Sequence, residues 1–169
     1  MNNEDTLLKK RLEMSEKQIR ACKEYFFELI LPMVLKKFLA YEKNLMVAVT
    51  GTASFGAADE FSDCDASIFL SKKDHNKIGN LMQDEIGKLP MRPWAEVQDP
   101  GIHFTVLNFG QMGLGKLFAF RSDKAWSQTS PVALWHLSKY KVLYDPKGKL
   151  SRFQSIAKAL MSLIYSKIS

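Results

Sequence analysis

The sequence predicts an α+β fold of mixed α/β character, in which a small mixed β-sheet is flanked by helices. The first observation is a set of short apolar runs bounded by turn residues, which is typical of strands. These runs lie at 45–49, 64–70, 102–109 and 141–144. The second observation is that longer segments with apolar residues at helical spacing open and close the chain. The third is size, since 169 residues with 46% hydrophobic and 25% charged residues suit one globular domain with its own core.

The single domain is expected to span 1–169, with an N-terminal helical segment at 1–44, a core at 45–146 and a C-terminal helix at 147–169. Within the first segment, residues 4–40 place apolar side chains near a 3.6-residue stripe, with Lys, Arg and Glu between them. Pro32 should break or kink this helix one turn before the proline. A basic helix lying on a membrane is the alternative, but the acids spread along the segment favour a helix that faces the core.

The core is expected to begin with a buried strand at 45–49. Residues 52–60 are small and turn-like, with room for a short helix, and the run at 64–70 is the second strand. A helix at 73–89 follows, because its apolar residues recur at helical spacing, and Pro90 ends it.

The second half of the core is expected to open with a β-hairpin. Trp94–Gln98 and Ile102–Phe109 are its strands, and Asp99-Pro100-Gly101 has the chemistry of a turn. Three short elements follow, namely a helix at 116–121, a helix at 132–139 and a strand at 141–144. The last helix has a full apolar face, which either closes this core or begins a helical domain outside the chain.

The net charge of +6 suits a polyanionic ligand such as a nucleotide or nucleic acid, although a surplus of lysine also simply solubilises a surface. Cys22 and Cys64 lie in different predicted elements and lack the spacing of a metal site, so we interpret them as free thiols. Free thiols indicate a reducing compartment, and we predict a cytoplasmic protein. No apolar run reaches the length that spans a bilayer, so no membrane association is expected.

The stretch from Val47 to Leu70 carries the chemistry. A strand that ends in Gly51-Thr52 brings backbone N–H groups close to a phosphate, because glycine lets the chain approach and a following helix start favours an anion. Asp63 and Asp65 are two apart in a predicted strand, so their carboxylates point to one face. Two like charges at this spacing favour a bound cation, and hard oxygen ligands suit Mg²⁺ together with substrate phosphates.

A simpler interpretation is that Asp63 belongs to a turn and Asp65 merely opens a strand. A lone Asp-x-Asp would favour it, and Gly51 to Gly56 lacks the Lys-Ser/Thr of a P-loop. The order of features favours a site instead, since an apolar strand, Gly-Thr, a spacer, Ser-Asp-x-Asp and a second apolar strand follow one another. Such a site combines a phosphate cradle with metal carboxylates, as in-line phosphoryl or nucleotidyl transfer requires.

The segments Gly51-Thr52-Ala53-Ser54-Phe55-Gly56 and Ser62-Asp63-Cys64-Asp65 resemble the DNA polymerase β-like nucleotidyltransferase superfamily. The small bacterial-type members, including antibiotic-modifying and antitoxin-like adenylyltransferases, are the most similar in pattern. The resemblance implies a nucleotidyltransferase-like fold and a triphosphate, expected to be ATP, held by Gly51 and Thr52, with Ser62 as a further cofactor-binding candidate. It also implies that Asp63 and Asp65 hold two Mg²⁺ ions.

The chain departs from that family at two places. Thr52 stands where serine is usual, which keeps the hydroxyl. The third carboxylate is missing from the later strand, where His103 takes its place, and Glu96 on the preceding run is a substitute. His103 could serve as a base because the pKa of imidazole lies near neutrality, but histidine is a poor Mg²⁺ ligand.

The leading prediction is therefore a Mg²⁺-dependent enzyme that passes an NMP from an NTP to a hydroxyl of a small molecule, protein or RNA. Asp63, Asp65, Glu96 and His103 are its catalytic candidates. The alternative is a catalytically degenerate module of the same fold that binds a nucleotide or a partner. RNA binding through the positive charge alone is a third hypothesis, which no motif supports. The acceptor, the preferred nucleotide and the oligomeric state stay open.

Overall fold

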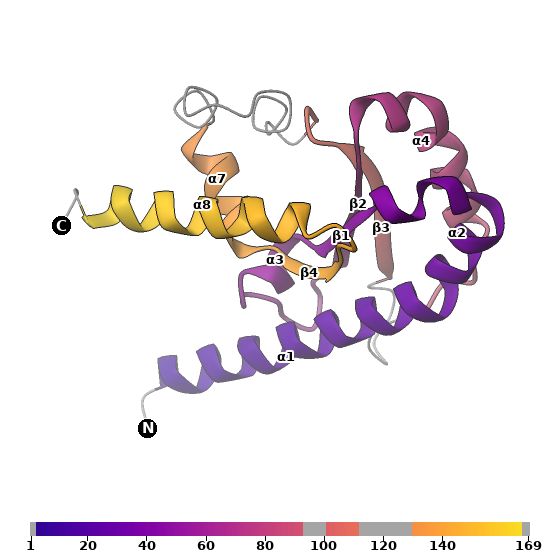
Figure 1. The fold of residues 1–169 in the computed structure, drawn as a ribbon. Helices are drawn as coiled ribbons and strands as arrows, with labels where there is room; N and C mark the ends of the chain where they lie inside the picture. Colours follow the sequence, from indigo (N-terminus) through magenta and orange to yellow (C-terminus); the bar gives the residue numbers. More distant parts are fainter. Residues whose placement is uncertain (1–2, 93–100, 112–129, 167–169) are drawn as a thin grey trace.

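The computed structural model describes residues 3–92, 101–111 and 130–166, which build a four-stranded sheet with helices on both faces (Figure 1). The strands are β1 (Met46–Val49), β2 (Cys64–Leu70), β3 (Ile102–Asn108) and β4 (Lys141–Tyr144). Their order across the sheet is β3-β2-β1-β4. β1 is antiparallel to β2 and β4, whereas β2 and β3 run parallel. The predicted α+β class with a small mixed sheet is confirmed.

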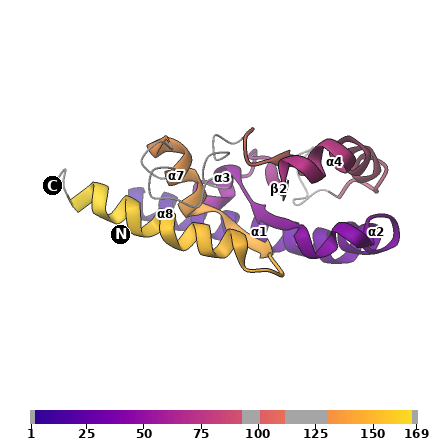
Figure 2. The same cartoon turned by 45° about the horizontal axis from the view of Figure 1, so that its top comes forward.

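The helices of the described chain are α1 (Asn3–Tyr25), the π-helical turn η1 (Phe26–Ile30), α2 (Leu31–Lys37), the 3₁₀ segment η2 (Leu39–Asn44), α3 (Gly51–Ser54), α4 (Lys72–Gly87), α7 (Pro131–Lys139) and α8 (Lys149–Ser166). The two longest, α1 and α8, both extend beyond the sheet toward the side where the termini lie (Figures 1 and 2). Long N-terminal and C-terminal helices were predicted, and both are present.

Two hydrophobic cores lie on the two faces of the sheet, because alternate residues of each strand point to opposite faces. The first core joins Val47, Val49 and Ile68 to buried residues of α1, η1, α2 and α4. The second core joins Met46, Ala48 and Phe69 to buried residues of α7 and α8. The apolar face of α8 thus contributes to this domain's own second core through Leu150, Ala157 and Met161.

The interruption predicted before Pro32 is present, and it takes the form of the π-helical turn η1. The N–H of Leu31 donates to the carbonyl of Phe26, five residues back rather than four. Proline lacks an N–H and its ring crowds the preceding turn, so a widened turn accommodates it without ending the helix. Phe26 and Ile30 remain fully buried, so the first core is continuous through the interruption.

The strand β3, which ends the row of described strands, is bonded to α4. The side chain of Gln83 donates to the carbonyl of Phe104 at 3.1 Å and accepts from the N–H of Val106 at 2.8 Å. One amide thus satisfies two backbone groups of the strand, as a neighbouring strand would. The helix begins at Lys72 and is capped by Ser71, whose hydroxyl accepts from the N–H of Asp74 at 3.0 Å.

Two predicted elements lie outside the described residues, namely the first hairpin strand at 94–98 and the helix at 116–121. The second hairpin strand is present as β3, and its described neighbour in the sheet is β2. Among the helices that the structure describes, none is both long enough and apolar enough to cross a membrane.

Candidate active site

The turn after β1 lies directly against Asp65. Gly51 has a φ of +66°, and a Cβ added to it would come within 2.8 Å of Oδ2 of Asp65. A side chain is therefore excluded by both the backbone angle and the space. Ser54 fixes the turn, because its hydroxyl donates to the carbonyl of Gly51 at 2.8 Å. Thr52 is exposed on this turn, so its hydroxyl is accessible to a ligand.

The two aspartates stand at the start of β2. Asp63 precedes the strand and Asp65 is its second residue, and both are exposed while Cys64 and Ala66 are buried. This alternation agrees with the prediction that Asp63 and Asp65 face one way. Partial desolvation raises the pKa of Asp65, and the negative charge of Asp63 raises it further. The two carboxylates therefore repel each other, which is the electrostatic setting that a cation would relieve.

His103 is brought beside Asp65 by the parallel pairing of β2 and β3. The two residues are direct partners in the register, and paired Cα atoms of adjacent strands lie about 5 Å apart. The histidine also acts on the carboxyl electrostatically, since it lowers the pKa of Asp65 against the two raising effects. The ring lies over Gly101, where an added Cβ would come within 3.2 Å of Nε2. Glu96, the other candidate for the third position, lies outside the described residues.

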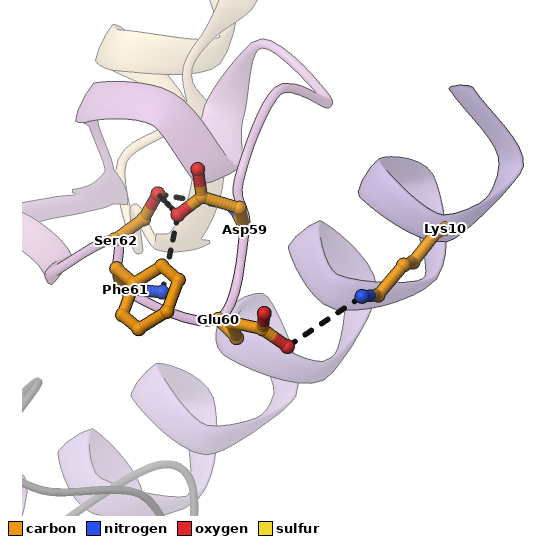
Figure 3. A network of polar contacts seen from close by, with 5 residues as sticks. All are labelled: Lys10, Asp59, Glu60, Phe61 and Ser62. Carbon is orange, nitrogen blue, oxygen red and sulfur yellow. Dashed lines mark hydrogen bonds and ion pairs between the residues drawn. The ribbon is translucent and has the colours of Figure 1, made fainter. Parts of the chain in front are cut away.

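The loop between α3 and β2 turns Ser62 toward Asp59 (Figure 3). The hydroxyl of Ser62 donates to Oδ1 of Asp59 at 2.7 Å and accepts from the N–H of Asp59 at 3.0 Å. The same carboxylate oxygen accepts from the N–H of Phe61 at 3.1 Å. These hydrogen bonds hold the pKa of Asp59 below its usual range, with the Ser62 hydroxyl as the largest cause. In this arrangement the Ser62 side chain shapes the loop that leads into Asp63.

Helix α1 anchors this loop through polar residues that sequence reasoning did not single out. The N–H of Ala58 donates to the hydroxyl of Ser15 at 3.0 Å, and Nε2 of Gln18 donates to the carbonyl of Ser62 at 2.8 Å. Lys10 adds an exposed ion pair with Glu60 at 3.5 Å (Figure 3). Ser15 and Gln18 are buried on an otherwise apolar stripe, and a polar residue on such a stripe was the available signal.

An aromatic group connects the turn to α7. Phe55, which follows α3, contacts Trp135 and His136 with ring centroids 4.8 and 5.3 Å apart. All three side chains are half-buried. Trp135 and His136 therefore link the second core to the Gly51 turn.

The donor set fits one Mg²⁺ ion better than two. Asp63 and Asp65 supply carboxylate oxygens, which magnesium prefers together with water and phosphate oxygens. Among the residues that the structure describes, no group of three or more His, Cys, Asp or Glu side chains is arranged to hold a metal. His103 occupies the third position beside Asp65, and imidazole is a weak ligand for magnesium.

A pocket of the described surface lies at the opposite end of the sheet. Lys43, Lys147 and Lys149 line it together with Asp74 and Asp145. Its acids already serve the fold, because Asp145 accepts from two N–H groups at the start of α8 and Asp74 accepts from the Ser71 hydroxyl. This pocket is separate from the aspartates of β2.

No protein-family model matches the chain, and no curated protein matches its sequence. The function must therefore be argued from the arrangement of Gly51, Asp63, Asp65 and His103.

Proposed function

We propose that the protein is a Mg²⁺-dependent nucleotidyltransferase that passes an NMP from an NTP, expected to be ATP, to a hydroxyl of a small molecule, protein or RNA. The observation that carries the proposal is the contact between the Gly51 turn and the carboxylate of Asp65. This contact brings a backbone suited to phosphate next to a carboxylate suited to a metal. The likeness of the Gly-Thr and Ser-Asp-x-Asp segments to polymerase β-like nucleotidyltransferases supports the same assignment.

Each residue has a distinct role in this proposal. Gly51 lets the backbone approach the phosphates, and the exposed hydroxyl of Thr52 donates to the same oxygens. Asp63 and Asp65 would hold Mg²⁺, which neutralises charge on the phosphates when bound. His103 stands beside Asp65 and would accept the proton of the attacking hydroxyl. Glu96 is the second candidate for that proton.

The first test measures nucleotide binding. ATP is titrated with Mg²⁺ into the wild-type chain and into Asp63→Ala/Asp65→Ala, with Asp84→Ala on the exposed face of α4 as the matched control. We expect the double variant to lose at least tenfold in affinity and the control to bind as the wild type does. Equal binding by all three proteins would refute the metal site.

A catalytically degenerate nucleotide-binding module is the second candidate. It is favoured by one specific observation, which is that histidine rather than an acid pairs with Asp65 on β3. Incubation with labelled ATP and pools of small-molecule, protein and RNA acceptors distinguishes the two. An enzyme releases pyrophosphate and labels an acceptor, whereas a module binds the nucleotide in the same mixture without releasing pyrophosphate.

A further inference from the structure

Two buried thiols meet behind the candidate site. Cys22 on α1 and Cys64 on β2 are 42 residues apart in the chain, yet their Sγ atoms are 3.0 Å apart. Both side chains are fully buried and both are free thiols. The thiol of Cys64 also donates to the carbonyl of Gln18 at 3.1 Å. The Cys64 sulfur therefore makes two contacts with α1, one to Cys22 and one to Gln18.

We propose that Cys22 and Cys64 are an oxidation site that forms an intramolecular disulfide between α1 and β2. The sulfur atoms need to approach by about 1 Å to reach the length of a disulfide bond. Both sulfurs already point into one shared space, so the bond needs a small shift of α1 and no change of topology.

Hydrogen peroxide is the oxidant in this proposal, since it is small and uncharged enough to reach a buried pair. One thiolate sulfur attacks a peroxide oxygen, the O–O bond breaks, and a sulfenic acid and hydroxide form. The second thiol then attacks the sulfenic sulfur, the S–O bond breaks and water leaves. In total, two thiols and one peroxide give one disulfide and two waters, with two electrons passing from sulfur to oxygen.

The buried position of the two thiols makes this reaction slow in the folded protein. The hydrogen bond to Cys64 and burial both raise the pKa of the Cys22 thiol, so its reactive thiolate is rare. The pair therefore persists as thiols until α1 moves or the oxidant is abundant.

The bond would link α1 covalently to the strand that carries both aspartates. Cys64 lies between Asp63 and Asp65, and the loop that the bond closes includes the Gly51 turn. A disulfide across a loop of this length constrains the unfolded chain strongly. We expect oxidation to raise the melting temperature by roughly 5–15 °C, a range that allows for some strain in the native state. This inference is independent of the proposed enzymatic activity.

The experiment uses the full chain, reduced and then freed of reductant, and treated with hydrogen peroxide. Peptide mapping should find the Cys22 peptide joined to the Cys64 peptide in the monomer, with a mass lower by two hydrogens. The melting temperature should rise, and dithiothreitol should reverse both changes. Met91 is 71% exposed, so its sulfoxide reports that the oxidant acted.

Cys22→Ser and Cys64→Ser are the matched controls, and neither should show a link or a rise in melting temperature on oxidation. The wild-type peptide map decides the question even if these variants fold poorly. The proposal is overturned if Met91 is oxidised while the two cysteines stay unlinked, whether as thiols, as sulfinic acids or as disulfides between chains.

Discussion

Gly51 is the residue on which the geometry of the site depends. Its positive φ turns the chain sharply after β1, and the absence of a side chain lets the turn contact Asp65. Gly148 has nearly the same backbone angle, with a φ of +62°, but an added Cβ there would meet nothing within 4 Å. Substitutions at the two glycines therefore distinguish the loss of stability caused by the backbone angle from the loss caused by the contact with Asp65.

We expect Gly51→Ala to destabilise the protein by about 2–4 kcal/mol and Gly148→Ala by about 1 kcal/mol, because only the first adds a clash to the strain of a left-handed residue. Urea unfolding of both variants measures the difference. Gly51→Ala should also weaken binding of Mg²⁺-ATP, and Gly148→Ala should not. Equal losses of stability would mean that the contact with Asp65 contributes nothing.

Asp65 gives a prediction about pH and magnesium. Its pKa is higher in the folded chain than in the unfolded chain, so the folded chain holds the proton more tightly. The protonated Asp65 therefore adds to the free energy of unfolding in acid. This addition is lost as the pH rises from the ordinary pKa of an aspartate through the raised pKa of Asp65 in the folded chain. Asp65→Asn should therefore be more stable than the wild type at neutral pH, by less than about 1 kcal/mol because the group is exposed.

Magnesium should reverse that order. Added Mg²⁺ should raise the melting temperature of the wild type, because it binds the folded state and relieves the repulsion between the aspartates. Asp65→Asn should respond weakly, and Asp84→Asn should respond like the wild type. Thermal melts without Mg²⁺ and with Mg²⁺ at about 10 mM, a roughly hundredfold excess over the protein, measure this effect. An equal response of all three proteins would contradict a metal site at Asp65.

For single residues, the sequence predicted those features that depend on the spacing of neighbouring residues along the chain. The period of a strand was enough to place Asp63 and Asp65 on one face, and their exposure agrees. The sequence could not predict the contact between Cys22 and Cys64. A contact between elements far apart in the chain depends on how the helix packs on the sheet. The role of Ser62 toward Asp59 depends on the loop conformation, which motif spacing does not specify.

Among the elements, β3 is the one whose position decides the character of the site. It lies at the edge of the sheet that the described strands form and pairs in parallel with β2, which places His103 beside Asp65. The amide of Gln83 is bonded to the backbone of this strand on both its donor and its acceptor side. Helix α4 therefore positions the histidine indirectly, through the strand.

Gln83→Ala should cost about 1–3 kcal/mol, because it leaves two backbone groups of β3 without their partner. The matched control is Asn80→Ala on the exposed face of the same helix, which should change stability by less than about 0.5 kcal/mol. Amide hydrogen exchange should quicken at Val106 in the first variant, because its N–H donates to Gln83. Unchanged exchange at Val106 would contradict the role assigned to Gln83.

Sequence patterns predicted most elements because each has a local signature. The strands predicted at 64–70 and 141–144 are present as β2 and β4, and the helices predicted at 73–89 and 132–139 are present as α4 and α7 within two residues of the predicted bounds. The π-helical form of the turn before Pro32 was not predictable, since proline specifies an interruption but not how the helix absorbs it. The parallel pairing of β2 and β3 also needs the tertiary arrangement, because strand patterns do not encode direction.

For the whole molecule, the central fact is that one sheet serves two cores. Neighbouring residues of β1 point to opposite faces, so Val47 and Val49 belong to the first core and Met46 and Ala48 to the second. Neither core can lose its packing without exposing a strand that the other core also needs. We therefore expect the described domain to unfold as one cooperative unit, even though helices cover the two faces separately.

A matched pair of leucines tests this cooperativity. Leu45 is 1% exposed in the first core and Leu137 is 0% exposed in the second, so truncation of either to alanine removes the same buried atoms. Each of Leu45→Ala and Leu137→Ala should cost about 2–5 kcal/mol. Both should shift a single urea transition, with unchanged slope, when it is followed by circular dichroism and by tryptophan fluorescence. Because Trp135 lies beside the second core, a variant whose fluorescence transition separates from its circular dichroism transition would show that the two faces unfold independently.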